Sequence, residues 1–339
     1  MTSLRHVLTR RDNNYLPHVD AYTRRTGGPW HGPSPLAVPL SGSISVVMPA
    51  HNAQATIGPI LDALARQRTT APVEVIVVDD ASTDRTASVA RSHPLGPTVA
   101  RVRERKGAGQ ARNLGAALAA GETIVFVDAD MVLPDHVLDT LARRAAAGLV
   151  LLGFRHNLPH AVHFDGRRLP ACPPDLTADH RVHWHGRPGR QLHTGTYLDH
   201  PVDARPLDDT SDLLELGHGR RYYDWDLPRM VVTCLLAVPR QAVLDVGGFH
   251  PGFTGWGGED THLGAALIAT GLTVAPLRQV VGFHLDPPDA ERLWPSKLAA
   301  WAPNAELYHR LLDQPPEPDG RARFAERTGR LLRDAEVTP

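Results

Sequence analysis

The sequence predicts an α/β fold in which a mostly parallel sheet is flanked by helices. Between residues 43 and 154, short apolar runs alternate with segments of helical spacing. This rhythm is typical of parallel strands joined by helices that cover both faces of the sheet. The chain has 339 residues, enough for one large elaborated domain or for two domains that share a core. We divide it into residues 1–42, 43–154, 155–228, 229–313 and 314–339.

Four strands and three helices can be placed from the apolar pattern of the first half. The predicted strands, in chain order, are "SISVVMPA", "VEVIVVDD", "TVARVRER" and "TIVFVDAD". The predicted helices between them are "AQATIGPILDALARQ", "STDRTASVARS" and "GAGQARNLGAALAAG". The second helix opens on Ser, Thr and Asp residues, which cap helix N-termini, and the third ends at Gly121.

The remaining segments are less regular. Residues 1–42 are rich in Arg, Pro and Gly without any period, so we expect an extended arm that needs a partner surface to become ordered. Residues 155–228 lose the strand and helix rhythm, which is typical of a functional lid or binding region. Regular structure returns in residues 229–313, and residues 314–339 form a tail that is Pro-rich and then helix-like.

Composition narrows the classes of function. The chain has 36 Lys and Arg against 37 Asp and Glu, so its bulk charge gives no reason to bind nucleic acid or an acidic membrane. Its two cysteines, Cys172 and Cys234, lie far apart, which fits a reducing compartment. No signal-like segment and no apolar run of membrane-spanning length is present. We therefore expect a cytoplasmic protein without integral membrane association, and leave a homodimer open.

The end of each of the four predicted strands carries at least one polar residue. Ligands of parallel α/β sheets bind beyond the carboxyl ends of the strands, so these residues describe a candidate site. They are Pro49, Ala50, His51 and Asn52; Asp79 and Asp80; Arg105 and Lys106; and Asp128, Ala129 and Asp130. The sequence lacks G-x-G-x-x-G after the first strand and lacks G-x-x-x-x-G-K-[ST], which disfavours nicotinamide, flavin and P-loop classes.

Asp128 and Asp130 end the fourth strand one residue apart. If the strand continues through them, its period of two directs both carboxylates to the same side, where a divalent cation would remove their repulsion. Hard oxygen ligands suit Mg²⁺ or Mn²⁺, which proteins often hold with one or two carboxylates and substrate phosphates. The alternative is a solvated Asp-x-Asp turn.

The segment "GWGGED", residues 255–260, is a second cluster of candidate functional residues. Its glycines allow close approach of the backbone, Trp256 offers a flat apolar face for a sugar ring, and Glu259 or Asp260 can accept a hydroxyl proton. The alternative is a capped helix N-terminus in which acidic residues complement the helix dipole. The two interpretations are compatible.

Four segments together resemble the inverting family 2 glycosyltransferases of GT-A fold. They are "VVMPAHNAQATI", "VEVIVVDDASTDRT", "GAGQARNLGAALAAGETIVFVDADMVLP" and "VGGFHPGFTGWGGEDTHLGAALIATG". The last also resembles the C-terminal part of β-1,4-galactosyltransferases. The resemblance covers residues 43–285 and is weakest over 155–228. It implies Mn²⁺- or Mg²⁺-dependent transfer of a sugar from a UDP-, GDP- or dTDP-linked donor to a small metabolite, a saccharide or a peptide.

The resemblance also implies a role for each residue that matches a family motif. The donor-binding residues would be Pro49, Ala50, Asn52, Asp79, Asp80, Arg112, Asn113, Asp128 and Ala129. The metal ligands would be Asp128, Asp130 and His284. Asp260 would be the general base with Glu259 beside it in the acceptor pocket, and the sugar or acceptor would pack on Trp256, Gly257 and Gly258.

Residues 155–228 carry weaker candidates. Tyr223 and Trp225 are predicted to stack on the acceptor, although packing within a lid explains them equally well. A zinc site at His183 and His185 would need ligands such as Cys172 or His193, and loop histidines are the simpler explanation. Two other functions remain as alternatives, a nucleotidyltransferase and a non-catalytic sugar-nucleotide-binding protein.

Overall fold

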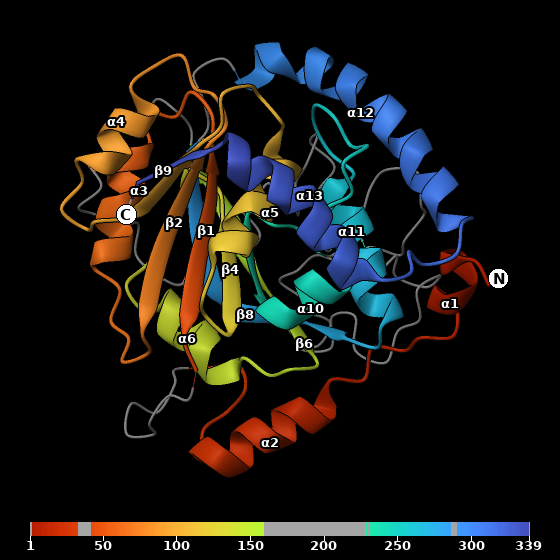
Figure 1. Cartoon of the computed structure of the whole chain (residues 1–339). Helices are drawn as coiled ribbons and strands as arrows, with labels where there is room; N and C mark the ends of the chain where they lie inside the picture. The colour runs from red at the N-terminus through yellow and green to blue at the C-terminus, as the bar shows by residue number, and fades with distance from the viewer. Residues whose placement is uncertain (1, 33–41, 159–227, 229–230, 286–289, 339) are drawn as a thin grey trace.

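A computed structural model of the chain describes residues 2–32, 42–158, 228, 231–285 and 290–338 (Figure 1). Its strands form one sheet in the order β5-β8-β6-β7-β4-β1-β2-β3-β9. The strands are β1 (Ile44–Ala50), β2 (Val73–Asp79), β3 (Thr98–Arg101), β4 (Thr123–Val127), β5 (Met131–Val132), β6 (Leu149–Leu158), β7 (Leu235–Pro239), β8 (Thr273–Leu285) and β9 (Glu336–Thr338).

The sheet is parallel where the sequence rhythm is strongest and mixed elsewhere. β1 pairs in parallel with β2 and β4, and β2 pairs in parallel with β3, which confirms the parallel arrangement predicted for the first four strands. β7 then runs antiparallel to both β4 and β6, and β5 and β9 join as short antiparallel strands. The predicted α/β class with flanking helices is confirmed, and these antiparallel strands make the sheet a mixed one.

Helices cover both faces of this sheet (Figure 1). One face carries α3 (Ile57–Ala65), α4 (Thr86–Arg91) and α6 (Val137–Arg144). The other carries α5 (Ala108–Leu118), α10 (Arg240–Asp245), α11 (Glu259–Ala269), α12 (Ala290–Leu312) and α13 (Gly320–Asp334).

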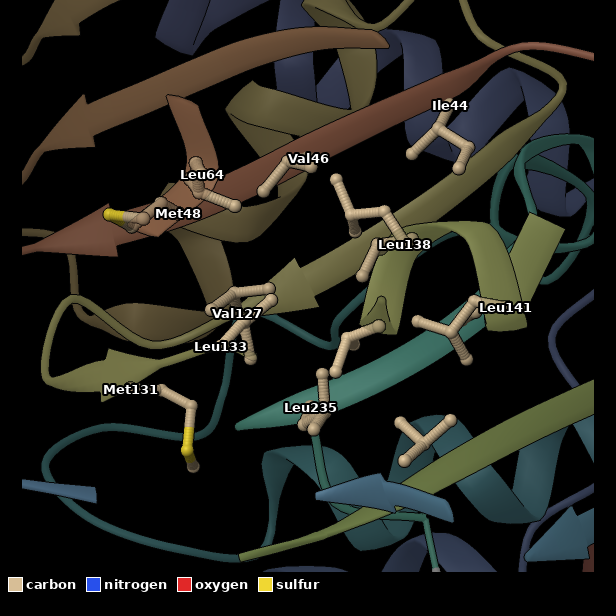
Figure 2. Packing of buried hydrophobic residues seen from close by; sticks show 14 of the residues in the cluster. Ile44, Val46, Met48, Leu64, Val127, Met131, Leu133, Leu138, Leu141 and Leu235 are labelled. Atoms are coloured by element: carbon tan, nitrogen blue, oxygen red, sulfur yellow. The ribbon is translucent and has the colours of Figure 1, made fainter. Parts of the chain in front are cut away.

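Successive side chains of each strand face opposite sides of the sheet, so each strand contributes to both hydrophobic cores. In β1, Val46 and Met48 face the α3 side, whereas Val47 faces the α5 side. Figure 2 shows Val46 and Met48 packed with Leu64 of α3 and Leu138 of α6. Burying each such side chain contributes roughly 1.5–3 kcal/mol, so the central strands hold the site rigidly at their carboxyl ends.

The expectation of an extended N-terminal arm is wrong for residues 2–32. They form α1 (Leu4–Leu8) and α2 (Leu16–Thr26), with Leu8 buried in one core and Tyr22 and Trp30 in the other. Asn13 Nδ2 donates to Val274 O at 2.7 Å, and Asn13 Oδ1 accepts the Val274 N–H at 2.7 Å. The anchors are too few and too widely spaced to produce a sequence period, so the pattern alone did not reveal them.

The C-terminal tail confirms the helix-like run as α13 and adds one strand that was not predicted. β9 lies antiparallel to the edge strand β3, with Arg101 opposite Glu336. A three-residue strand has no period of its own, and its pairing depends on a neighbour more than 230 residues away in the chain. Among the helices that the structure describes, none is long and apolar enough to cross a membrane.

Candidate functional site

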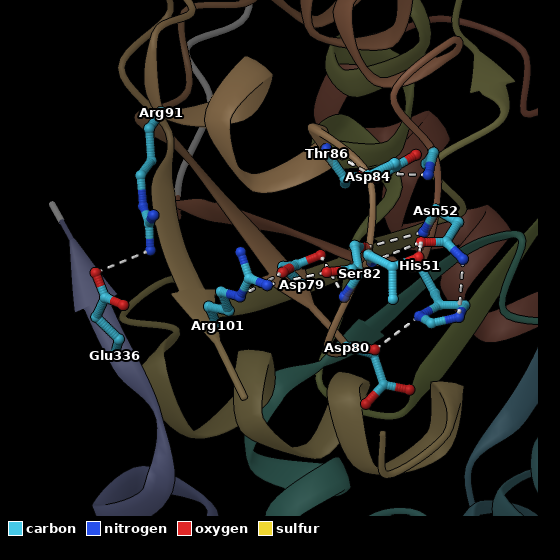
Figure 3. A network of polar contacts seen from close by, with 12 residues as sticks. His51, Asn52, Asp79, Asp80, Ser82, Asp84, Thr86, Arg91, Arg101 and Glu336 are labelled. Carbon is cyan, nitrogen blue, oxygen red and sulfur yellow. Dashed lines mark hydrogen bonds and ion pairs between the residues drawn. The ribbon is translucent and has the colours of Figure 1, made fainter. Parts of the chain in front are cut away.

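The carboxyl ends of β1 and β2 lie side by side, as their parallel register requires, with Ala50 opposite Asp79. The Asp80 N–H donates to Ala50 O at 2.8 Å, which continues the pairing past the strands. Asn52 has φ of 51°, and its Oδ1 accepts the Thr83 N–H at 2.9 Å (Figure 3). The predicted base and ribose residues therefore gather on two adjoining loops.

Asp79 and Asp80 brace the loops around this end of the sheet. Asp79 is fully buried, and its Oδ2 lies 3.3 Å from Arg101 Nε. The Asp80 carboxylate accepts the N–H groups of Lys106 and Gly107, at 2.6 and 2.8 Å, just before α5 begins. Both carboxylates thus hold the surrounding backbone, and their direct contact with a donor stays a prediction.

Arg112 of α5 connects the carboxylates of the two motifs that the sequence singled out. It is only 4% exposed, and its Nη2 donates to Asp128 Oδ1 at 2.7 Å. Its Nη1 lies 3.5 Å from Glu259 Oε1 and 3.5 Å from Asp260 Oδ1. Burial alone would lower the pKa of Arg112, but the three carboxylates raise it above its ordinary value, so the guanidinium stays charged.

Asn113, beside it, occupies a different environment from the one predicted. It is fully buried, with Nδ2 donating to Phe249 O at 2.8 Å and Oδ1 accepting the Phe249 N–H at 2.8 Å. Gly247 and Gly248, which precede Phe249, have φ of 83° and 67°, values that favour glycine. The side-chain amide of Asn113 thus closes the turn that these glycines form. We assign Asn113 to supporting this turn in place of the donor contact expected from the motif.

Asp130 and His284 come together through the pairing of β5 with β8, in which Met131 lies opposite His284. Asp130 Oδ2 lies 3.3 Å from His284 Nε2, whereas Asp130 Oδ1 is buried without a hydrogen-bond partner. Burial would raise the pKa of Asp130, but His284 and Arg155 outweigh it and lower the pKa. The two residues thus lie in contact, and their role as metal ligands stays a prediction.

The Asp128 carboxylate accepts a hydrogen bond from Arg112. Burial, together with the charges of Asp130 and Asp260, raises the pKa of Asp128 although Arg112 lowers it. Within the described ranges, no three His, Cys, Asp or Glu side chains gather as a ready metal cage. Asp130 and His284 nevertheless fit one side of a Mn²⁺ or Mg²⁺ site, because Asp130 Oδ1 lacks a partner and such ions take their other ligands from phosphates and water.

The "GWGGED" loop is held in a conformation that needs its glycines. Gly255, Gly257 and Gly258 have φ of 77°, 86° and 91°, which L side chains rarely adopt. Asn304 of α12, 3% exposed, donates through Nδ2 to Thr254 O and to Gly257 O, each at 2.8 Å. Sequence reasoning missed Asn304, since one Asn within a helical segment carries no signal.

Glu259 and Asp260 open α11, and their environments differ. Burial, and then the charge of Asp260, raises the pKa of Glu259 to about 7. Asp260 accepts two hydrogen bonds from Thr233, from Oγ1 to Oδ1 at 2.7 Å and from the N–H to Oδ2 at 3.1 Å. These two hydrogen bonds fix the orientation of the Asp260 carboxylate.

Replacing Glu259 with Gln is expected to stabilise the protein at neutral and alkaline pH. The ordinary pKa of Glu is 4.5, and the folded value is about 7, so the native state binds more protons between these values. The stability that protonated Glu259 contributes is complete below the ordinary pKa of 4.5, and it is lost as the pH rises through the folded pKa of about 7. Glu259→Gln should therefore exceed the wild type by about 1–3 kcal/mol near pH 8 and match it near pH 4.5.

Urea unfolding of both proteins at the two pH values measures this difference. Glu306→Gln is the matched control, because the Glu306 side chain is 77% exposed and should show no such pH dependence. A wild type whose stability relative to Glu259→Gln is the same at both pH values would contradict the raised pKa.

The remaining candidates lie outside the described residues. They are Tyr223 and Trp225, and the histidines and cysteine of the weaker zinc hypothesis, His183, His185, His193 and Cys172. Trp256, by contrast, is described and half-buried within the glycine loop.

Two family models match the chain. Residues 45–181 match the model described as glycosyl transferase family 2, and residues 215–284 match the one described as the N-terminal domain of galactosyltransferase. Validoxylamine A glucosyltransferase of Streptomyces hygroscopicus subsp. limoneus is 32% identical over 277 residues, which cover 74% of this chain and 53% of that protein. The uncharacterized glycosyltransferase YfnE of Bacillus subtilis (strain 168) is 26% identical, over 72% of this chain and 65% of its own.

The chain spans about half the length of the first of these relatives. Among solved structures, mannosyltransferase PcManGT from Pyrobaculum calidifontis has a TM-score of 0.53 at 20% identity, over 92% of this chain and 76% of that one. GalNAc-T7 has a TM-score of 0.51 at 16% identity, over 85% of this chain and 54% of that one. At these identities the two structures show the fold, which is the GT-A arrangement expected from the motifs. Residues 45–181 are therefore similar to glycosyl transferase family 2, and the chain has the GT-A fold.

Proposed function

We propose that the chain is a metal-dependent, inverting glycosyltransferase that moves a sugar from a nucleotide-sugar donor to an acceptor hydroxyl. The observation that carries this proposal is the contact of buried Arg112 with Asp128 at the end of β4 and with Glu259 and Asp260 at the start of α11. A pair of carboxylates suited to taking a proton thus lies one side chain away from the strand end suited to phosphates.

The relatives support the choice of donor class and metal. Validoxylamine A glucosyltransferase bears the activity in its name. PcManGT is described in complex with GDP-Man and Mn²⁺, and GalNAc-T7 with UDP, GalNAc and Mn²⁺. We therefore infer a sugar donor linked to UDP, GDP or dTDP and a requirement for Mn²⁺ or Mg²⁺. Asp130 and His284 would be the protein ligands of the metal, with Asp128 close by.

Each residue of the site has a role that follows from charge. A bound divalent cation would neutralise charge that develops on the departing diphosphate. Arg112 keeps its positive charge in the buried site and holds Asp128 and the acidic pair in place. Asp260, whose carboxylate is held in place by Thr233, takes the proton from the acceptor, and Glu259 orients the acceptor beside it.

The donor side follows the strand ends. The end of β1, with Pro49 and Ala50, and the loop that follows, with Asn52, receive the base and ribose. The Asp80 N–H pairs with Ala50 O, and the Asp79 carboxylate accepts the Ser82 N–H, which keeps the next loop in position. Trp256 and the glycines beside it form the surface on which the donor sugar or the acceptor packs. One displacement from the face opposite the diphosphate inverts the anomeric centre.

A screen of nucleotide sugars for metal-dependent hydrolysis tests the proposal without knowledge of the acceptor. The wild type, incubated with UDP-, GDP- and dTDP-linked hexoses and Mn²⁺, is expected to release nucleoside diphosphate from a subset of them. The Asp130→Ala protein is the control for contaminating hydrolases. Release that is equal in the wild type and the variant, or no release from any donor, would contradict the proposal.

A further inference from the structure

The short segment before β7 touches both carboxylate motifs. The Asp128 N–H donates to Cys234 O at 3.3 Å. The adjacent Thr233 is fully buried, and both its N–H and its Oγ1 donate to the carboxylate of Asp260. Two neighbouring residues therefore join the end of β4 to the start of α11, and this segment fixes where the Asp260 carboxylate lies relative to Asp128.

The bonds to Asp260 distinguish its two oxygens. Oδ1 accepts the Thr233 hydroxyl at 2.7 Å and lies 3.5 Å from Arg112 Nη1. Oδ2 accepts one neutral backbone N–H, from Thr233 at 3.1 Å. Because each oxygen of a carboxylate has two lone-pair sites, Oδ2 keeps one for a further donor. The Thr233 hydroxyl sets the rotation of the carboxylate and thereby the direction of that lone pair.

Close packing prevents this segment from shifting relative to α11. The Val231 N–H donates to Pro228 O at 3.1 Å. Gly264 of α11 lies against these two residues, and a Cβ at that position would be 2.6 Å from Pro228 O and 2.8 Å from Val231 Cβ. Only glycine leaves room for this approach, so the helix that carries Asp260 is in direct contact with the segment that holds its side chain.

We propose that Thr233 is a positioning residue whose hydroxyl orients Asp260 so that Oδ2 faces the acceptor. This inference rests on the proposed function, in which Asp260 is the general base. The acceptor proton passes to Oδ2 while the acceptor oxygen bonds to the anomeric carbon. The bond from that carbon to the diphosphate breaks, and its electron pair leaves with the diphosphate. Thr233 takes part only through the hydrogen bond that holds the base.

The effect of Thr233 on the reaction can be separated from its effect on the fold. Thr233→Val keeps the shape and the backbone N–H but removes the hydroxyl, whereas Thr233→Ser keeps the hydroxyl. Thr328 offers a matched control, because it is 3% exposed in α13 and its Oγ1 bonds to Phe324 O at 2.7 Å. Thr328→Val removes a buried hydroxyl of the same kind without touching Asp260.

The test measures kcat, donor KM and Tm for these variants, with the donor found by the hydrolysis screen. Thr233→Val is expected to lose about 10–100-fold in kcat, the usual worth of a hydrogen bond to a charged group. Donor KM should stay within about twofold, and Thr233→Ser should recover kcat to within about threefold of the wild type. Thr328→Val should keep the wild-type kcat even if its Tm falls.

Several outcomes would overturn the inference. An unchanged kcat in Thr233→Val would do so, and so would an equal loss in Thr233→Ser, since packing would then explain the effect. If Thr233→Val fails to fold, Thr233→Ala, which also lacks the hydroxyl, replaces it in the comparison with Thr233→Ser. A wild type that turns over no donor would contradict the proposed function itself. An active wild type whose kcat is unchanged by Thr233→Val would contradict only the role of Thr233.

Discussion

Replacing Asp260 with Asn is expected to lower kcat by about 10²–10⁴-fold, the usual contribution of a positioned general base. Asn keeps the shape of the side chain, and its amide oxygen can still accept from Thr233, but it cannot take a proton from the acceptor. Donor affinity should change little, because the proposed donor contacts lie at the carboxyl ends of β1, β2 and β4. Steady-state kinetics at saturating donor, with nucleotide affinity measured separately, checks both parts.

Two further variants make this result specific. Glu259→Gln should raise the acceptor KM more than it lowers kcat, because Glu259 is assigned to orienting the acceptor. Asp245→Asn, in which the altered side chain is 47% exposed on α10, should behave as the wild type. A near-normal kcat in Asp260→Asn would show that the base is assigned wrongly. Normal kinetics in both Asp260→Asn and Glu259→Gln would leave the two carboxylates with only a helix-capping role.

The second large effect is expected for Asp130→Ala, which should abolish metal-dependent donor hydrolysis and weaken metal-dependent nucleotide binding. Asp130 Oδ2 contacts His284 and its Oδ1 is a buried atom without a partner, so the carboxylate is available to a cation. The side chain is 37% exposed, and removing it should leave the fold intact. Activity across a Mn²⁺ titration, together with Tm, measures the change.

Asp62→Ala serves as the control for this variant, because the Asp62 side chain on α3 is 60% exposed. It should keep the wild-type dependence on Mn²⁺. Full turnover by the wild type in excess EDTA would contradict the metal requirement, and full turnover by Asp130→Ala would remove Asp130 from the site.

The sequence predicted the part of the fold that has a local period. The apolar runs of β1 to β4 and the spacing of α3 and α5 follow from side chains that alternate between two buried cores. β9 and the packed N-terminal helices were not predicted, since their anchors, such as Asn13 and Trp30, act singly and over long distances in the chain. Local periodicity holds no information about such contacts.

The candidate site also contains residues that the sequence indicated and residues that it did not. The motifs indicated Asp128, Asp130, Glu259 and Asp260 by their residue types, and the resemblance indicated His284, which contacts Asp130 in the structure. The ion pairs of Arg112 with Asp128 and with Glu259 could not be predicted, because they join segments that are far apart in the sequence. Thr233 and Asn304 gave no signal, because a single polar residue reveals its role only when its neighbours in space are known.

Binding of nucleoside diphosphates with and without Mn²⁺ tests the central proposal most directly. Isothermal titration calorimetry with UDP, GDP and dTDP needs neither the sugar nor the acceptor. One of the three is expected to bind at least about tenfold more tightly in Mn²⁺ than in excess EDTA, as phosphates complete the coordination of a cation held by few protein ligands. Asp130→Ala should lose that difference. Equal affinities for all three nucleotides, unchanged by EDTA, would contradict a metal-dependent nucleotide-sugar site at these strand ends.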